Sequence, residues 1–351
     1  MIFRYPTQFP ADAVERRVPD AATARALVRE RNPQLQELLV YRRERFAALI
    51  AARSDHPPVA GAEDAVLMAF CRLAFRHGSW GDDFHAYHNE GHIFEILGPR
   101  LERLIDAIGI DSLSLRDWFL LALFAAAHDL RQRETPQFFA GIGSNERASI
   151  EETFRILRTC GFSVEHNAEV FIGIELMIAG STFDARPPPP ALELNSAEVV
   201  VESGGALAQK LDVKLDKHAP GWQDDPRIAH ALELAAIAAD LDTANVAEAF
   251  PLFMASAERL CLEREMRSHR DPATAASAQP MLNFLTTGQE HYFFDLHRFS
   301  SDAGRTAFAA AKQANVQPMR GLIQDLRAAV PAPRTGAEVL AAFRALTEKA
   351  Q

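Results

Sequence analysis

The sequence predicts an all-α protein, and three observations support this fold class. Apolar residues recur at the three- and four-residue spacing of a helix face in segment after segment. No segment shows the sustained alternation of a strand, and no fixed-period repeat is present. Residues 114–130 and 226–250 are apolar on nearly every side, which is typical of helices buried in a core. With 351 residues, of which 48% are hydrophobic, the chain is long enough to enclose such a core.

The N-terminal region is expected to be mostly irregular. Three prolines interrupt the chain before residue 33. A helix is predicted only from Pro33 to residue 52, where the apolar residues partly follow helical spacing. Two further prolines, Pro57 and Pro58, then break the chain. We therefore expect residues 1–60 to form an N-terminal extension with one helix.

Residues 61–250 are expected to form the core of the fold. Gly98 and Pro99 should bend or divide one of its helices, and Pro226 suits the first turn of another. A polar loop at 131–145 and a proline-rich segment at 186–190 interrupt the pattern. Residues 251–351 should add a C-terminal region of three or four helices packed on the core. The predicted core helices cover residues 65–78, 88–109, 114–130, 146–161, 168–180 and 226–250.

Composition narrows the classes of function. The formal net charge is -10, so the chain has no general electrostatic attraction to nucleic acid or anionic lipid. Its three cysteines are widely spaced, which favours a reducing compartment. The first residues lack the apolar stretch of a signal peptide, and the longest apolar run, Trp118–Ala127, is far shorter than the ~20 residues of a membrane span. We therefore expect a cytoplasmic protein that binds neither a nucleic acid polymer nor a membrane.

Charged residues among apolar ones identify a candidate metal site. His88 and His92 are four residues apart and would share one face of a helix. His128 and Asp129 end an apolar helix, and Asp240 lies inside a later apolar segment, AAIAADL. A buried charge is costly unless a partner or a metal neutralises it. Imidazole and carboxylate ligands on convergent helices suit a divalent ion such as Mn, Fe, Zn, Mg, Ni or Co.

At these residues the chain resembles the HD superfamily of metal-dependent phosphohydrolases, whose ligands occur in the order H…HD…D. YHNEGHIFEIL is similar to the YHNxxH element of the cyclic-nucleotide phosphodiesterases and of small predicted bacterial HD phosphohydrolases. SNERASIEETFRIL resembles a helix of the latter group, and AADLDTAN resembles the element that carries the last ligand. The resemblance covers roughly residues 80–250.

The resemblance implies an HD-domain helical bundle with extra N- and C-terminal helices. It assigns His92, His128, Asp129 and Asp240 as metal ligands, gives Asp129 a catalytic role, and makes His88 the general acid that protonates the leaving oxygen. Gln132 departs from many phosphodiesterases, which have a histidine there. Residues expected to support the ligands or contact substrate are Asn89, Arg131, Gln132, Asn145, Glu146 and Arg147. Candidate phosphate contacts are Arg131, Arg133 and Arg147.

The expected function is hydrolysis of a phosphoester in a small phosphorylated molecule of the nucleotide or cyclic-nucleotide class. A metal-activated water attacks phosphorus while His88 acts as general acid. No histidine between Asp129 and Asp240 lies in a matching motif, so one protein-ligated metal is expected. Two alternatives remain open: an HD-type metal oxygenase acting on a small organic molecule, and a non-catalytic module that senses a nucleotide. The apolar C-terminal helices also leave a homodimer open.

Overall fold

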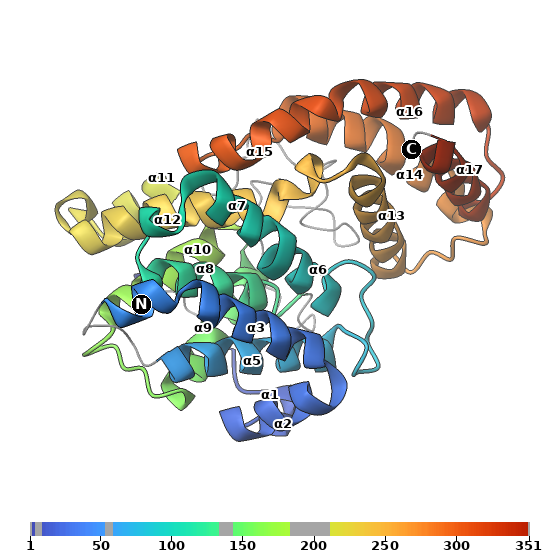
Figure 1. Cartoon of the computed structure of the whole chain (residues 1–351). Coiled ribbons are helices and arrows are strands. Elements are labelled where there is room, and N and C mark those ends of the chain that lie inside the picture. Colours follow the sequence, from blue (N-terminus) through green and yellow to red (C-terminus); the bar gives the residue numbers. More distant parts are fainter. Residues whose placement is uncertain (1, 4–8, 53–58, 133–142, 183–210, 350–351) are drawn as a thin grey trace. The chain divides into compact units, whose positions relative to one another are not determined.

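The computed structural model describes residues 2–3, 9–52, 59–132, 143–182 and 211–349. Every regular element in these ranges is helical, which confirms the all-α prediction (Figure 1). The chain divides into two compact units: the first comprises residues 1–182 and 207–242, the second residues 183–206 and 243–351. Most of the loop predicted at 131–145 and all of the segment at 186–190 lie outside the described residues. No described helix is long and apolar enough to cross a membrane.

The described part of the first unit is built from helices α1 to α12, joined by turns and short helical segments. Its elements are α1 (Ala13–Arg17), α2 (Ala21–Arg31), α3 (Pro33–Arg45), α4 (Ala47–Ala51), α5 (Val59–Arg76), α6 (Glu90–Glu95), the π-helical η1 (Ile96–Arg100), α7 (Leu101–Ile108), the 3₁₀ η2 (Ile110–Ser112), α8 (Leu115–Ala127), α9 (Ser144–Thr159), α10 (Ala168–Gly180), α11 (Leu211–His218), the 3₁₀ η4 (Trp222–Asp224) and α12 (Pro226–Asp242).

Helix α8 is the central element of the first unit. It packs against α5, α9, α10 and α12, and every side chain from Leu120 to Ala127 is buried. Gly173 permits the close crossing of α10, because a Cβ at this position would lie 2.8 Å from Leu120 Cδ1. A capping box formed by Ser114 and Asp117 begins the helix. His128 directly follows the last turn of α8 and is therefore buried in the interior.

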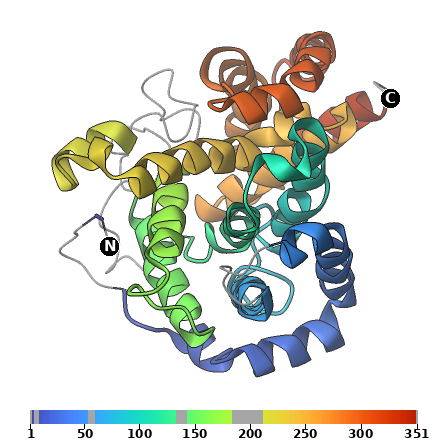
Figure 2. The same ribbon diagram turned by 60° about the vertical axis from the view of Figure 1, so that its left-hand side comes forward.

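The N-terminal region contains more helix than the single one predicted within residues 1–60. Four helices, α1 to α4, precede residue 53. Asp12 and Asp20 accept hydrogen bonds from the backbone N–H groups of Glu15 and Thr23, so each caps a new helix. The prolines that suggested an irregular chain stand outside these helices. Both α1 and α2 pack against α5, and Figure 2 shows the blue N-terminal helices passing around the light-blue α5.

Two predicted helices have revised bounds. Gly98 and Pro99 lie in the π-helical segment η1, which divides the helix predicted at 88–109 into α6 and α7. Pro99 lacks the N–H group that would continue the α-helical hydrogen bonds, which explains the division. Helix α12 begins at Pro226 as predicted, but it ends at Asp242 rather than near residue 250, and a 3₁₀ segment follows.

The described part of the second unit is also helical. Helix α14 packs against α17, α16 packs against α17, and α15 packs against η5. The described part of this unit contains five α-helices, whereas three or four were predicted for residues 251–351. The elements are η5 (Thr243–Ala247, 3₁₀), α13 (Phe250–Arg267), α14 (Ala275–Asn283), the π-helical η6 (Phe284–Gly288) and η7 (His291–Leu296), α15 (Asp302–Ala314), α16 (Val316–Ala329) and α17 (Gly336–Lys349).

Candidate metal centre

Four side chains from three distant segments of the first unit converge. His92 lies on α6, His128 and Asp129 directly follow α8, and Asp242 is the last residue of α12. His92 Nε2 lies 3.0 Å from Asp242 Oδ1 and 3.9 Å from Asp129 Oδ2. His128 Nε2 lies 3.0 Å from Asp129 Oδ2 and 3.4 Å from Asp242 Oδ1. These four residues are called the interior cluster below.

The separations within the interior cluster match those between ligands of one divalent ion. A nitrogen or oxygen ligand lies about 2.1 Å from such an ion, so two ligands are about 3.0 Å apart at a right angle and about 3.4 Å apart at a tetrahedral angle. The four histidine–aspartate distances run from 3.0 to 3.9 Å, and the ligand atoms of His92, His128 and Asp242 all lie within 4.8 Å of one another. Two imidazole nitrogens and two carboxylates are a donor set that suits several first-row divalent ions. The residues present therefore fit a metal ion.

The surroundings of His128 orient its ring for ligation. Its Nδ1 lies 3.1 Å from the carbonyl oxygen of Phe124, so that Nδ1–H donates to this carbonyl and Nε2 is the nitrogen that faces the two aspartates. Nε2 of His128 and Oδ2 of Asp129 are both buried, and neither has a hydrogen-bond partner. Because buried polar atoms are nearly always satisfied, two unsatisfied atoms facing each other indicate a place for a cation.

Carboxylates dominate the electrostatics of the interior cluster. Burial by itself lowers the pKa of a histidine, but the charges of Asp129 and Asp242 raise the pKa of His128 well above its ordinary value. Burial opposes ionisation of the two carboxyl groups as well, yet His128 holds the pKa of Asp129 and of Asp242 below the ordinary value. Both aspartates are therefore ionised at neutral pH, and the cluster carries negative charge that a divalent cation neutralises.

The last aspartate of the cluster differs from the prediction, which placed Asp240 there. Asp240 is buried, but the carboxylate that meets the two histidines belongs to Asp242. Two residues advance the direction of a side chain by about 200° around an α-helix, so Asp240 and Asp242 point to nearly opposite sides of α12. The apolar run around Asp240 was the misleading signal, because it marks burial and not which face of the helix meets the histidines.

Gln132 and Asn145 extend the interior cluster by hydrogen bonds. The Gln132 side-chain amide donates to Asp129 Oδ1, the oxygen not facing His128. Asn145 Nδ2 in turn donates to Gln132 Oε1 over 3.3 Å. Gln132 therefore fixes the orientation of the Asp129 carboxylate, as supporting residues of metal ligands do. Burial, with a smaller contribution from the Asp129 charge, raises the pKa of the neighbouring Glu146.

His88 lies beside the interior cluster but not on the helix expected for it. Helix α6 begins only at Glu90, because Asn89 is its N-cap and accepts a hydrogen bond from the backbone N–H of Gly91. His88 is thus in the preceding turn, and its ring centroid lies 6.2 Å from that of His92. Its side chain is 8% exposed, and its charge lowers the pKa of Asp129 after the larger effects of burial and His128. Asn89 shapes this turn and also donates to the carbonyl of His85.

The two described arginines predicted as phosphate contacts are held by carboxylates elsewhere. Arg131 is 3% exposed and forms ion pairs with Glu15 and Glu152. Arg147 pairs with Glu151 at 3.1 Å and lies over the ring of Phe9. Sequence reasoning missed these roles because the acidic partners of Arg131 come from α1 and α9, far away in the chain. The third candidate, Arg133, lies outside the described residues.

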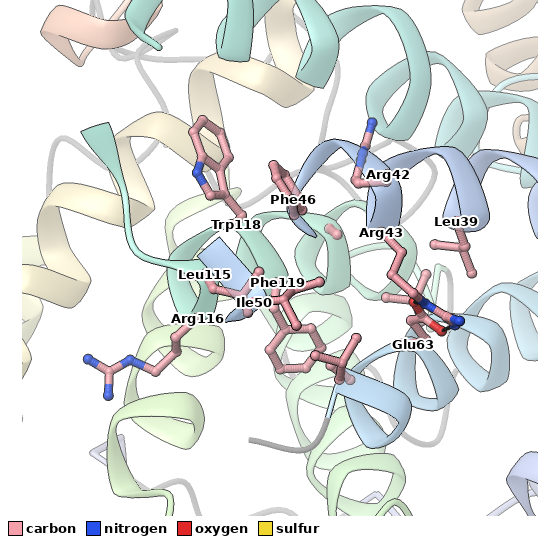
Figure 3. Close-up of a pocket in the computed structure, with 14 residues that line it drawn as sticks. Leu39, Arg42, Arg43, Phe46, Ile50, Glu63, Leu115, Arg116, Trp118 and Phe119 are labelled. Carbon is pink, nitrogen blue, oxygen red and sulfur yellow. Dashed lines mark hydrogen bonds and ion pairs between the residues drawn. The ribbon is translucent and has the colours of Figure 1, made fainter. Parts of the chain in front are cut away.

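An apolar pocket is lined mainly by residues from α3, α5 and α8. Figure 3 shows Phe46, Trp118 and Phe119 around it, and Arg43 pairs with Glu63 at its side. No residue of the interior cluster lines this pocket. It is therefore a separate feature of the first unit, and the one carboxylate among its lining residues, Glu63, is paired with Arg43.

No family model matches the chain, and no curated protein matches it significantly. The assignment of the site therefore depends on the residues themselves. The structure brings together His92, His128 and Asp129 as the sequence indicated, replaces Asp240 by Asp242, and places His88 and Gln132 next to them.

Proposed function

We propose that the chain is a metal-dependent phosphohydrolase of the HD type, acting on a phosphoester of a small molecule of the nucleotide class. The observation that carries the proposal is the interior cluster: two histidines and two ionised aspartates at ligand separations, with buried donor atoms lacking hydrogen bonds. The order of these residues along the chain adds support, because it follows the H…HD…D pattern even with Asp242 as the last ligand.

In this proposal His92, His128, Asp129 and Asp242 hold the divalent metal. A bound divalent ion supplies a water of lowered pKa and neutralises charge on the phosphoryl oxygens. Gln132 keeps one oxygen of Asp129 occupied, so that the other faces the histidines. His88, beside the cluster and outside the ligand set, provides the proton for the leaving oxygen.

A cation for the substrate's phosphate is part of this proposal. Arg131 and Arg147 are paired with carboxylates, and the cation assigned to this role is Lys214 of α11. Its charge acts on the buried Glu146, which in turn feels the charge of Asp129. A Lys214→Met variant should lower kcat/KM, since a cation on the phosphate under attack stabilises the charge of the transition state as well as that of the bound substrate.

The test is phosphoester hydrolysis by the purified full chain loaded with Mn²⁺. The panel contains cyclic nucleotides, linear nucleotides and an aryl phosphodiester. Asp129→Ala serves as the blank, and Asp111→Ala, at an exposed aspartate outside the site, is the matched control. We expect turnover by the wild type and by Asp111→Ala, and none by Asp129→Ala.

An Asp129→Ala protein with wild-type activity would contradict the assignment. No turnover of any panel member by a metal-loaded wild type would also contradict it, and would favour the oxygenase or the nucleotide-sensing module. Oxygen consumption distinguishes the first of these, and nucleotide binding without turnover distinguishes the second.

The proton-donor role has its own test. His88→Ala should retain the metal and lose about 10²- to 10⁴-fold in kcat, the range typical of a general acid. The loss should be smaller for a substrate whose leaving group is already acidic, such as the aryl phosphodiester. Equal losses on acidic and basic leaving groups would assign His88 to positioning instead of proton transfer.

A further inference from the structure

A second group of metal-ligating side chains lies in the loop between α5 and α6. His77 directly follows α5, and Asp83 and His85 follow within eight residues. Asp83 Oδ2 lies 3.6 Å from His77 Nδ1 and 3.4 Å from His85 Nε2. All three donor atoms lie within 4.8 Å of one another. These three residues are called the loop cluster below.

His77 is the unusual member of the loop cluster. Its side chain is nine-tenths buried, yet neither ring nitrogen has a hydrogen-bond partner. Its ring lies beside that of His85, with centroids 4.1 Å apart. The backbone holds the two rings together, because the N–H of His85 donates to the carbonyl oxygen of His77 over 2.8 Å. A buried imidazole without a partner is costly, so the arrangement calls for a group that accepts its lone pair.

We propose that the loop cluster binds a second divalent first-row cation, with zinc as the reference ion, through His77, Asp83 and His85. Two imidazoles and one carboxylate are an established ligand type for such ions, with water completing the coordination. The separations of 3.4 and 3.6 Å are too long for strong hydrogen bonds and match two ligands that share one ion about 2.1 Å from each. Asp83 is 71% exposed, which gives a cation access from solvent.

The position of the loop cluster suggests what this cation does. The chain continues from His85 directly into Tyr87, His88 and Asn89, the turn that precedes α6. Asn89 Nδ2 donates to the carbonyl oxygen of His85 over 2.5 Å, so the two segments are physically linked. The cation therefore clamps the loop that presents His88 and the start of the helix bearing His92. Its binding requires neither hydrolysis nor any ion in the interior cluster.

The experiment counts zinc ions bound by the full chain after removal of metal with a chelator. Elemental analysis and calorimetric titration with Zn²⁺ alone are applied to the wild type, Asp83→Ala, Asp129→Ala and the double variant. Asp82→Ala is the matched control, because Asp82 is the adjacent aspartate, is also exposed and lies outside the cluster. The exposed side chain of Asp83 makes its substitution compatible with folding, which thermal melting of the chelated protein checks.

We expect two zinc ions per chain in the wild type and in Asp82→Ala, one in Asp83→Ala, one in Asp129→Ala, and none in the double variant. The affinity of the loop cluster should fall by more than about 100-fold in Asp83→Ala, beyond the loss typical of a supporting residue. Asp83→Ala with an unchanged count and affinity would overturn the proposal, as would an Asp129→Ala protein that binds no zinc. If the wild type binds one zinc ion, and Asp83→Ala removes it while Asp129→Ala does not, the interior cluster fails and the loop cluster stands. The two failures are therefore distinguishable.

Discussion

The interior cluster and the loop cluster place the same residue types together by different routes. The interior cluster joins α6, the end of α8 and the end of α12, so it exists only when the first unit is folded. The loop cluster lies within residues 77–85 and needs only the end of one helix and a short loop. Their electrostatics differ too. Two ionised carboxylates raise the pKa of His128, whereas burial lowers the pKa of His77 to about 3 with a single exposed aspartate nearby.

The difference shows what convergence of distant helices contributes. In the interior cluster, burial of two carboxylates makes the site depend on a cation for charge balance. In the loop cluster, the imidazole is held neutral and its lone pair is the feature that favours a metal. Substitutions at single residues test whether these two descriptions hold.

The largest effect is expected when each of the two candidate aspartates of α12 is replaced by alanine in turn. Asp242→Ala should lower the metal affinity of the interior cluster by more than about 100-fold, because a ligand matters more than the residues that support it. Asp240→Ala should leave this affinity within a few fold, although the loss of a buried polar group should lower the free energy of unfolding. Calorimetric titration with Mn²⁺ and thermal melting separate the two effects. Retained affinity in Asp242→Ala, with loss in Asp240→Ala, would restore the original assignment.

The case of Asp242 shows how far the sequence alone reaches. His92, His128 and Asp129 were found because each stands out against an apolar helix or a recognisable spacing. Between Asp240 and Asp242 the sequence favoured the residue in the more apolar surroundings. The choice depends on the rotation of α12 about its axis, which packing against α8 and α10 sets and which no local pattern records.

The fold was predicted more completely than the site. The helical class, the central position of the helix at 114–130 and the start of α12 at Pro226 follow from periodicity and caps. The helices before Pro33 were missed because the prolines outweighed the capping aspartates in the reading of the sequence. The role of Arg131 was missed for a different reason: its partners Glu15 and Glu152 are 116 and 21 residues away. The loop cluster matches no motif, so only the folded loop indicates it.

The second effect concerns the ion pairs of Arg131. Arg131→Met should lower the free energy of unfolding by about 1–3 kcal/mol, because the buried Glu15 and Glu152 lose one of the arginines that pair with them. Arg72 continues to pair with both glutamates, which limits the loss. The number of metal ions bound should not change, since Arg131 supports the fold and not the interior cluster. Urea denaturation at neutral pH and elemental analysis give the two values. Loss of metal at unchanged stability would place Arg131 in the site after all.

A smaller effect is expected at Gln132, which contacts only one ligand of one cluster. Gln132→Ala should weaken metal binding at the interior cluster by about 10- to 100-fold, the usual cost of removing a residue that orients a ligand. Zinc binding by the loop cluster should be unaffected. Gln132→His tests whether an imidazole at this position adds a ligand. A tighter site in Gln132→His and a weaker one in Gln132→Ala would show that position 132 sets the affinity.

The smallest effect at neutral pH comes from a buried histidine, His297, that pairs with none of the described carboxylates. His297, in the second unit, is 0% exposed, its Nε2 lies 3.2 Å from Thr243 Oγ1, and Lys312 donates to its carbonyl oxygen. Burial, followed by the charge of Lys312, lowers its pKa to about 3. Below pH 6.5, the ordinary pKa of histidine, His297 is protonated in the unfolded chain but stays neutral in the folded chain. The stability that neutral His297 allows is therefore complete above pH 6.5 and is lost as the pH falls toward 3.

His297→Phe removes this titration while keeping an aromatic ring between Tyr292 and Phe299. Between pH 6.5 and 4 the wild type should lose stability faster than the variant, by at most about 1.4 kcal/mol per pH unit. Urea unfolding at several pH values, with the difference between the two proteins taken at each, cancels the carboxylates that titrate in both. A difference in stability that stays constant with pH would mean that His297 is protonated in the folded chain as readily as in the unfolded chain. Burial without a carboxylate would then not be enough to keep a histidine neutral, and the contrast between His297 and the charged His128 would be lost.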